Sequence, residues 1–262
     1  MSYYLGIDIG SSATKGVLVK SGKVIADYLA SSSGDYRAAA QSVRSELLKK
    51  VNLNDKDIAA TAITGHNISE LPFRHRQLAD IRCCARGIRR LLPEARTIID
   101  IQALSSRAIR LSAEGLVTDF TTSEKCAAGS GRLLELMANI LRVDFEAMGP
   151  LSLESGAPVS FTTSCAVFEE SEVISRIADG AAVPDILAGV HQSLAEKLAA
   201  LVQKVGLEEG VALSGGAALD KGLVKSLEKK LGVKLLIPPK PRLVTALGAS
   251  IMAAETNQEE QR

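Results

Sequence analysis

The chain has 262 residues, of which 46% are hydrophobic and 23% charged, and its formal net charge is +1. This length allows one large or two modest domains with substantial apolar cores. Basic residues are interleaved with acidic ones, which argues against a nucleic-acid-binding surface. The sequence has no basic region followed by a long apolar run at its start, and no stretch of the roughly 20 apolar residues that span a membrane. We therefore expect a cytoplasmic protein that binds neither nucleic acid nor membrane.

A strand and turn motif occurs twice in the chain. Residues 5–9 form an apolar strand that runs into Gly10-Ser11-Ser12, and residues 16–20 resemble a second strand. The pattern recurs at a constant offset of 92 residues, where Asp100 corresponds to Asp8 and Arg107 to Lys15. Period-two runs around turns at Ser21-Gly22 and Glu114-Gly115 predict an antiparallel meander in each copy, and Asp119-Phe120 corresponds to Asp27-Tyr28.

This duplication predicts an α/β protein of two lobes, whose acids face each other across a cleft. The boundaries that we expect are 1–95 for the first lobe, 96–255 for the second and 256–262 for a frayed polar tail. Helical periodicity predicts helices over 36–52, 78–92, 129–141, 166–178, 186–205, 219–231 and 246–254. Short apolar runs predict strands over 59–64, 97–101, 211–213 and 234–237.

The first turn has the composition of a phosphate site. Glycine permits close approach of an anion to backbone N–H groups, and hydroxyl groups add donors. Gly10, Ser11, Ser12 and Ala13 would form this cradle, Lys15 would add positive charge, and Asp8 could hold Mg²⁺ through water. Most Gly-Ser turns bind nothing, so the turn alone is weak support.

Two later segments favour a nucleotide as the ligand. A strand ends at Gly215-Gly216-Ala217, which suits a flat nucleoside against bare backbone, and Gly248 lies in a run of small residues suited to a hinge. Together with the repeated acid, these segments resemble the actin, sugar kinase and Hsp70 superfamily. The resemblance implies two ribonuclease-H-like lobes that bind ATP or ADP with Mg²⁺ between them.

Two cysteines, Cys126 and Cys165, each precede a helical pattern. The positive end of a helix macrodipole lowers the pKa of a nearby thiol and favours an anionic cluster. An iron–sulfur cluster usually takes four thiolates, so a two-fold axis between two chains would complete the set. Zinc with four thiolates remains the competing metal. The adjacent Cys83 and Cys84 are interpreted as packing or interface residues.

The surrounding residues carry a closer resemblance. Cys126-Ala-Ala-Gly129-Ser130-Gly131-Arg and Ser-Cys165-Ala-Val-Phe-Glu-Glu-Ser-Glu are similar to the cysteine motifs of the BadF/BadG/BcrA/BcrD-type ATPases. These are activators of 2-hydroxyacyl-CoA dehydratases and ATPase subunits of benzoyl-CoA reductases. The resemblance implies a [4Fe–4S] cluster held by Cys126 and Cys165 of two protomers, with Gly129, Ser130 and Gly131 among the cofactor-binding residues. It also implies helices that swing on ATP binding and hydrolysis, a homologous second ATPase subunit, an iron–sulfur acyl-CoA reductase or dehydratase partner, and a low-potential reductant such as ferredoxin.

The second acid departs from the family pattern. Activators typically have Asp-Ile-Gly-Gly-Gln-Asp there, whereas this chain has Asp100-Ile-Gln102-Ala-Leu. The run Ala103-Leu104 followed by Arg107-Ala-Ile is similar to the smaller reductase ATPase subunit, which favours that role. Asp8, Asp100 and Gln102 are the catalytic candidates. Gln102 could orient water, hydrolysis could be slow, or the bulkier loop could exclude the γ-phosphate.

Three other functions remain open at this point. A small-molecule kinase of the same superfamily would need an acceptor site and would hold no iron. A zinc-stabilised or regulatory subunit would bind ATP without hydrolysing it. A homodimeric dehydratase activator would form its cluster from this chain alone.

Overall fold

The computed structural model describes residues 2–32, 34–66, 70–123, 129–161 and 166–260. The chain divides into two compact units, each built around a five-stranded sheet. The first unit comprises Met1–Glu94, Ala113–Val117 and Pro238–Arg262, and the second comprises Ala95–Ser112 and Thr118–Ile237. The predicted α/β class with two duplicated sheets is confirmed.

The sheet of the first unit has the order β3-β2-β1-β4-β5. Its strands are β1 (Tyr3–Ile9), β2 (Ala13–Lys20), β3 (Lys23–Ser31), β4 (Ile58–Gly65) and β5 (Arg76–Gln77). The first three form the expected antiparallel meander, and β4 pairs in parallel with β1 and with β5. The helices are α1 (Tyr36–Lys50), α2 (Asp80–Leu91) and α8 (Val244–Glu260), with short 3-10 turns at Asp55–Asp57 and Pro241–Leu243.

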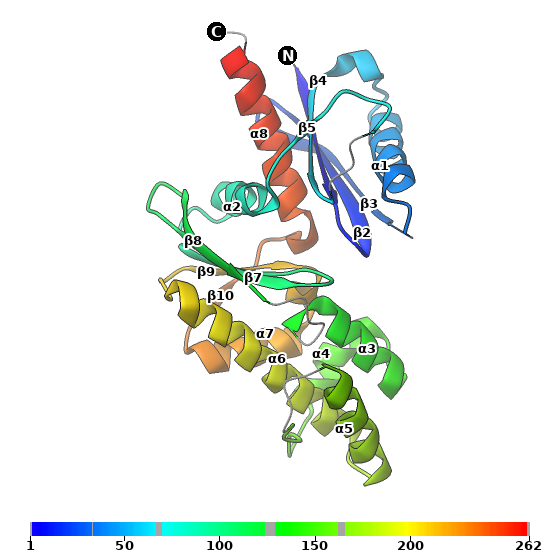
Figure 1. Cartoon of the computed structure of the whole chain (residues 1–262), viewed down its shortest axis with the longest axis vertical. Coiled ribbons are helices and arrows are strands. Elements are labelled where there is room, and N and C mark those ends of the chain that lie inside the picture. Colours follow the sequence, from blue (N-terminus) through cyan, green and yellow to red (C-terminus); the bar gives the residue numbers. More distant parts are fainter. Residues whose placement is uncertain (1, 33, 67–69, 124–128, 162–165, 261–262) are drawn as a thin grey trace. The chain divides into compact units, whose positions relative to one another are not determined.

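Two helices cover opposite faces of this sheet (Figure 1). Side chains alternate along β1, so that Leu5, Ile7 and Ile9 pack in one apolar cluster with residues of α1. On the other face Gly6 meets α8, where an added Cβ would lie 2.1 Å from the carbonyl oxygen of Ala246. The backbone of α8 therefore lies directly on β1.

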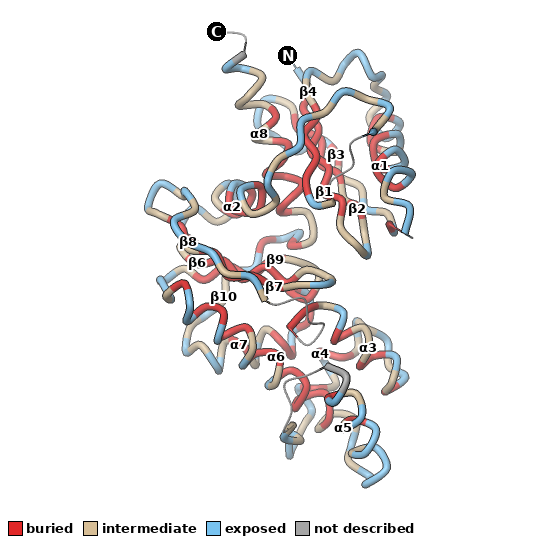
Figure 2. The backbone as a smooth tube through the Cα atoms, in the orientation of Figure 1, coloured by how far each residue is buried: buried red, intermediate tan, exposed pale blue. Residues whose placement is uncertain are grey.

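The second sheet has the order β10-β9-β6-β7-β8. Its strands are β6 (Thr97–Ile101), β7 (Ser106–Leu111), β8 (Val117–Thr122), β9 (Val211–Gly215) and β10 (Leu235–Leu236). The helices are α3 (Gly131–Leu141), α4 (Phe145–Leu153), α5 (Ala166–Ala178), α6 (Val183–Val205) and α7 (Lys221–Leu231), with a 3-10 turn over Gly216–Leu219. Buried side chains of β6, β9, α3, α6 and α7 form one core (Figure 2). No helix within the described ranges is long and apolar enough to cross a membrane.

The C-terminal helix differs from the sequence-based expectation. Its residues after 238 belong to the first unit, whereas the predicted boundary placed everything up to 255 in the second lobe. Residues 256–260 continue α8, so this part of the expected frayed tail is helical. Helix α4 was not predicted, because Gly149-Pro150 within it resembles a helix end.

Two glycines allow α8 and α2 to cross closely. At Gly248 an added Cβ would lie 1.7 Å from the carbonyl oxygen of Cys83, and at Gly87 it would lie 2.0 Å from that of Val244. Cys83 and Cys84 are fully buried and form no disulfide, which agrees with a packing role. The two helices are in backbone contact because both lack a side chain where they cross.

Replacement of Gly248 by alanine tests this contact. Alanine normally stabilises a helix interior by about 1 kcal/mol relative to glycine. Here we expect Gly248→Ala to lower the free energy of unfolding by about 2 kcal/mol, because its methyl group overlaps Cys83. Gly156→Ala is the matched control, since no atom lies within 4 Å of its added Cβ. A urea-unfolding midpoint for Gly248→Ala equal to or above that of the parent would contradict this packing.

Candidate functional site

The first turn joins β1 to β2 and brings Asp8 opposite Lys15 in the strand register. Their Nζ–Oδ2 distance is 3.1 Å, and the side chains are 19% (Lys15) and 10% (Asp8) exposed. The N–H of Gly10 donates to the carbonyl oxygen of Ala13 at 3.1 Å. An added Cβ at Gly10 would lie 2.8 Å from both that oxygen and the Nζ of Lys15. Glycine is therefore needed for Lys15 to reach over the turn.

The tip of this turn has open hydrogen-bond donors. Among the residues that the structure describes, neither the N–H groups nor the hydroxyl groups of Ser11 and Ser12 have a hydrogen-bond partner. With the ammonium group of Lys15 nearby, these donors suit an anion such as a phosphate. The predicted cradle of Gly10, Ser11, Ser12, Ala13 and Lys15 therefore occurs as one local structure.

Ser32 braces the first turn, and sequence reasoning missed it. Its hydroxyl donates to the carbonyl oxygen of Gly10 at 2.6 Å and lies 2.9 Å from the hydroxyl of Thr14, while its N–H donates to Ser12. Ser32 is 1% exposed. The turn is thus held from the end of β3, so its open donors need little ordering to bind a ligand.

The second turn repeats this geometry within the second unit. Asp100 is opposite Arg107, and the N–H of Gln102 donates to Ser105 as that of Gly10 does to Ala13. The Nε and Nη2 atoms of Arg107 lie 3.0 and 2.8 Å from Oδ2 of Asp100, and both side chains are 4% exposed. The hydroxyl of Ser214 donates to Oδ1 at 2.6 Å. Both carboxylate oxygens of Asp100 therefore have protein partners.

The fourth strand of each sheet in chain order, which pairs in parallel with the first, extends the duplication. On β4, Thr64 and Gly65 are opposite Asp8 and Ile9, and on β9, Ser214 and Gly215 are opposite Asp100 and Ile101. Both glycines have positive φ, +85° and +95°, and an added Cβ would lie 2.3 or 2.0 Å from the opposing isoleucine oxygen. The hydroxyl-glycine pair at the end of a buried strand is the sequence signal that could have identified Thr64 and Gly65.

Gln102 connects the second turn to α3. Its carbonyl oxygen accepts from the N–H of Gly131 at 2.9 Å, and that of Ala103 accepts from Arg132 at 3.0 Å. Its side-chain Oε1 accepts from the hydroxyl of Ser105 at 3.4 Å. The N–H of Gly131 is thus used within the protein, although Gly131 was predicted among the cofactor-binding residues with Gly129 and Ser130. The start of α3 is therefore hydrogen-bonded directly to the second turn.

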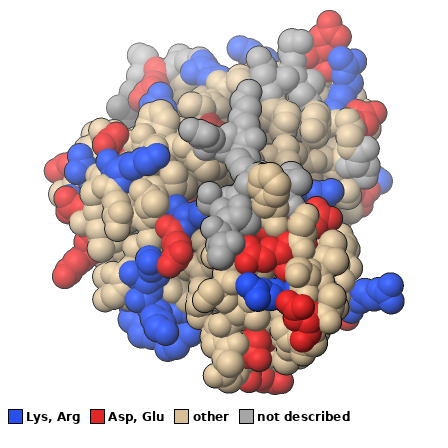
Figure 3. Space-filling view, turned by 60° about the horizontal axis from the view of Figure 1, so that its bottom comes forward, with Lys and Arg blue, Asp and Glu red and all other residues tan. Residues whose placement is uncertain are grey.

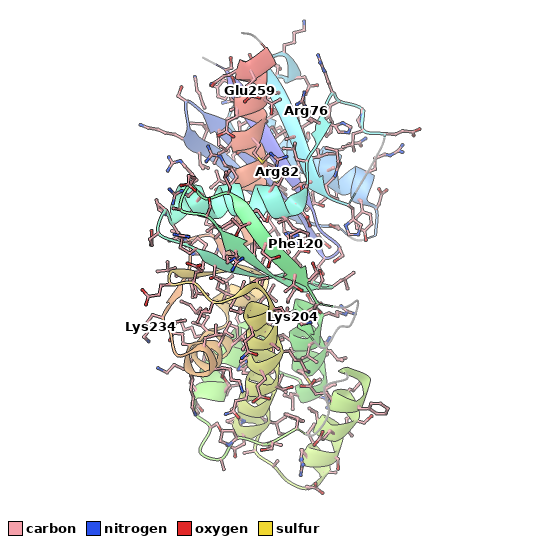
Figure 4. The ribbon with its side chains drawn as sticks, turned by 60° about the vertical axis from the view of Figure 1, so that its left-hand side comes forward. Arg76, Arg82, Phe120, Lys204, Lys234 and Glu259 are labelled. Carbon is pink, nitrogen blue, oxygen red and sulfur yellow. The ribbon has the colours of Figure 1, made fainter. Side chains whose placement is uncertain are left out.

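The other predicted residues have separate places. Gly215 is the residue before the 3-10 turn, which begins with Gly216 and Ala217. Gly248 lies in α8 of the first unit, where its contact with Cys83 already requires a glycine. Asp119-Phe120 lies on β8 as Asp27-Tyr28 lies on β3, but Phe120 is 51% exposed (Figure 4). Gly215, Gly216, Ala217 and Gly248 as ligand contacts stay predictions.

Cys126 and Cys165 lie outside the described residues. In the part of the chain that the structure describes, no group of three or more His, Cys, Asp or Glu side chains could hold a metal ion. The helix after Cys165, α5, contacts α3 and α6. On the face in Figure 3, acidic and basic side chains are interspersed.

Comparisons with known proteins agree with this architecture. The family model described as the BadF/BadG/BcrA/BcrD ATPase family matches residues 5–253. The structure of the activator of 2-hydroxyisocaproyl-CoA dehydratase from Clostridium difficile with bound ADPNP is 36% identical, with a TM-score of 0.92 over 99% of this chain and 97% of that one. Component A of (R)-2-hydroxyglutaryl-CoA dehydratase from Acidaminococcus fermentans is 34% identical, with a TM-score of 0.93 over 98% and 100% of the two chains.

Two further matches bear on role and fold. A benzoyl-CoA reductase subunit from Thauera aromatica is 36% identical over 265 residues, covering 97% of this chain and 94% of that protein. A ROK family glucokinase from Streptomyces griseus is 12% identical with a TM-score of 0.63, over 97% and 100% of the chains. The glucokinase shows a shared sugar-kinase type of fold and nothing about activity.

We expect the Asp8–Lys15 and Asp100–Arg107 pairs to respond differently when the cation is removed. Arg107→Met leaves the carboxylate of Asp100 buried without its counter-ion, which we expect to cost about 3 kcal/mol of unfolding free energy. Lys15→Met should cost less than half as much, because the side chain of Asp8 is 10% exposed against 4% for Asp100 and accepts one hydrogen bond from Lys15 where Asp100 has a partner on each oxygen. Urea unfolding of the two variants measures the difference. Equal losses would show that the pairs are equivalent.

Proposed function

Because the chain belongs to the BadF/BadG/BcrA/BcrD ATPase family, we propose that it is an ATP-hydrolysing activator that delivers low-potential electrons to an acyl-CoA dehydratase or reductase component. The observation that carries this proposal is the braced turn at Gly10–Ala13, with its open donors and adjacent Lys15. It occurs in a chain that matches a dehydratase activator with bound ADPNP over 99% of its length.

In this proposal the first turn binds the phosphates of ATP and ADP. The donors of Ser11 and Ser12 and the charge of Lys15 would hold the phosphate oxygens. Asp8 fits Mg²⁺, because its Oδ1 has no hydrogen-bond partner among the described residues. Asp100 does not fit as a direct metal ligand in this arrangement, since Arg107 and Ser214 engage both its oxygens. Gly215, Gly216 and Ala217 would contact the nucleoside.

The proposed electron carrier is a [4Fe–4S] cluster shared by two chains. Each chain has two candidate thiolates, Cys126 and Cys165, and such a cluster takes four. Cys165 directly precedes α5, which contacts α3, the helix that follows Cys126. When bound, the cluster would supply the transferred electron, received from a reductant such as ferredoxin. The second turn holds the start of α3 through Gln102 and Ala103, which supports coupling of hydrolysis to this region.

Two alternative partners are proposed for this chain, a dehydratase and a reductase. Two solved structures at more than 30% identity are an activator of 2-hydroxyisocaproyl-CoA dehydratase and component A of (R)-2-hydroxyglutaryl-CoA dehydratase, which favours the activator role. The run Ala103-Leu104 with Arg107-Ala108-Ile109 favours a reductase ATPase subunit as the second candidate, and the reductase protein of Thauera aromatica is also 36% identical. An activator would assemble its cluster as a homodimer, whereas a reductase subunit would need a different second ATPase subunit.

Anaerobic purification with iron and sulfide analysis tests the cluster. We expect about four irons per two chains, with an electron paramagnetic resonance signal after reduction. Cys126→Ser and Cys165→Ser should each lose the iron, because each removes two of the four thiolates from the pair. Cys83→Ser serves as the control that retains it, since Cys83 is fully buried in α2. Bound zinc in place of iron, or iron retained in Cys126→Ser, would overturn this assignment.

Phosphate release tests the role of the first turn. We expect Asp8→Asn to lower the rate of ATP hydrolysis about a hundredfold without changing the iron content, because the charge at the phosphate and Mg²⁺ site is lost. Asp119→Asn is the control, as its exposed carboxylate bonds only its neighbouring N–H among the described residues. ATP binding without phosphate release in the parent protein would instead identify a regulatory subunit.

A further inference from the structure

Helix α6 makes a buried polar contact with Asp220. This residue directly follows the Gly215–Leu219 turn, which consists of Gly215 and the 3-10 turn over Gly216–Leu219. His191 is fully buried, with Nε2 3.0 Å from Oδ2 of Asp220 and Nδ1 3.0 Å from the hydroxyl of Ser152 on α4. The other oxygen of Asp220 accepts from the N–H groups of Gly222 and Leu223 and caps α7. His191 therefore contacts the carboxylate that fixes the start of α7.

Two helical glycines make room for this network. An added Cβ at Gly222 would lie 2.0 Å from the hydroxyl of Ser152 and 2.7 Å from Nδ1 of His191. At Gly149 it would lie 2.8 Å from Oδ1 of Asp220. Glycine in a helix costs about 1 kcal/mol relative to alanine, so the chain gives up helix stability to bring these polar groups together.

Serine, histidine and aspartate in this order resemble a hydrolytic triad, but this one cannot meet a substrate. The three residues are 6%, 0% and 5% exposed and lie among the helices of the core. These residues therefore hold parts of the protein together and do not act on a substrate. The N–H of Asp220 donates to Ala217 at 3.1 Å, so Asp220 closes the Gly215–Leu219 turn with its backbone and contacts α6 with its side chain.

The same helix carries a second polar contact, which is partly buried, six residues later. Lys197 donates to Oε2 of Glu169 on α5 at 2.6 Å, and Glu169 is fully buried. Of the α5 side chains that the structure describes, only Glu169 and Val173 are buried, so this ion pair is a main attachment of α5. Six residues of helix place His191 and Lys197 about 9 Å apart along the axis and on different faces.

We propose that α6 connects the Gly215–Leu219 turn, which would hold the nucleoside, to α5. His191 and Lys197 are the positioning residues at its two contacts. The inference rests on the proposed function, which assigns the nucleoside to Gly215–Ala217 and the cluster to the residue before α5. A shift of the turn moves Asp220, which moves α6 through His191, and α6 moves α5 through Lys197 and Glu169. Neither positioning residue touches the nucleotide.

A tryptophan on α5 reports on this connection. The chain has no tryptophan, and Phe168 is 66% exposed, so Phe168→Trp gives a single fluorescent reporter at a tolerant position. In this background we expect ATP to change the emission. Lys197→Met should abolish that change while calorimetry gives an ATP Kd within about threefold of the parent. His191→Gln should abolish it and raise the Kd about tenfold, because the turn loses its support.

Controls separate coupling from folding and from the proposed function. Lys204→Met, an exposed position on the same helix, should keep the emission change (Figure 4). If Lys197→Met does not fold, the double variant Lys197→Met with Glu169→Gln leaves no unpaired buried charge and should give the same loss. An emission change retained in the Lys197 and His191 variants, or absent in the parent that binds ATP, would overturn the coupling alone. Absence of ATP binding in the parent would overturn the proposed function and the coupling with it.

Discussion

An ion pair across a β-hairpin stands at the end of the first strand of both units. In each unit an aspartate near the end of the first strand is opposite a cation near the start of the second, and a hydroxyl residue of the fourth strand completes the row. In the second unit the pair is buried and saturated, as expected for a structural contact. In the first unit Asp8 keeps an oxygen without a partner among the described residues, and the adjacent turn keeps its donors. The number of engaged carboxylate oxygens thus separates two nearly identical motifs into a structural one and one suited to a ligand.

Rigid support around the turns is the second common feature. Ser32 holds the first turn from the end of β3, and the second turn holds the first residues of α3. Asp220 closes the Gly215–Leu219 turn and contacts α6. Each predicted ligand-binding segment is therefore tied to a helix or strand by a hydrogen bond or a close polar contact. Such ties allow a small displacement at a ligand to reach a distant helix, because packed elements move as units.

Sequence periodicity predicted the strands and helices whose apolar residues recur at a regular spacing. The register of the two hairpins follows from the alternation of apolar residues, and the start of α5 at Ala166 follows from the apolar period after Cys165. The placement of α8 did not follow, because it depends on contacts between Gly6 and Ser250, far apart in the sequence. The correspondence of Thr64-Gly65 with Ser214-Gly215 was missed because the connection from β3 to β4 is much shorter than that from β8 to β9. Ser32 and His191 carry no motif, and only tertiary structure reveals their partners.

The proposed ATP-driven electron transfer is tested most directly by following the oxidation state of the cluster. The anaerobically purified and reduced chain is mixed with a purified acyl-CoA dehydratase component, and the cluster absorbance is recorded with and without ATP. The proposal predicts oxidation of the cluster only when ATP is present, together with phosphate release. Oxidation at the same rate without ATP, or phosphate release with the cluster still reduced, would contradict it.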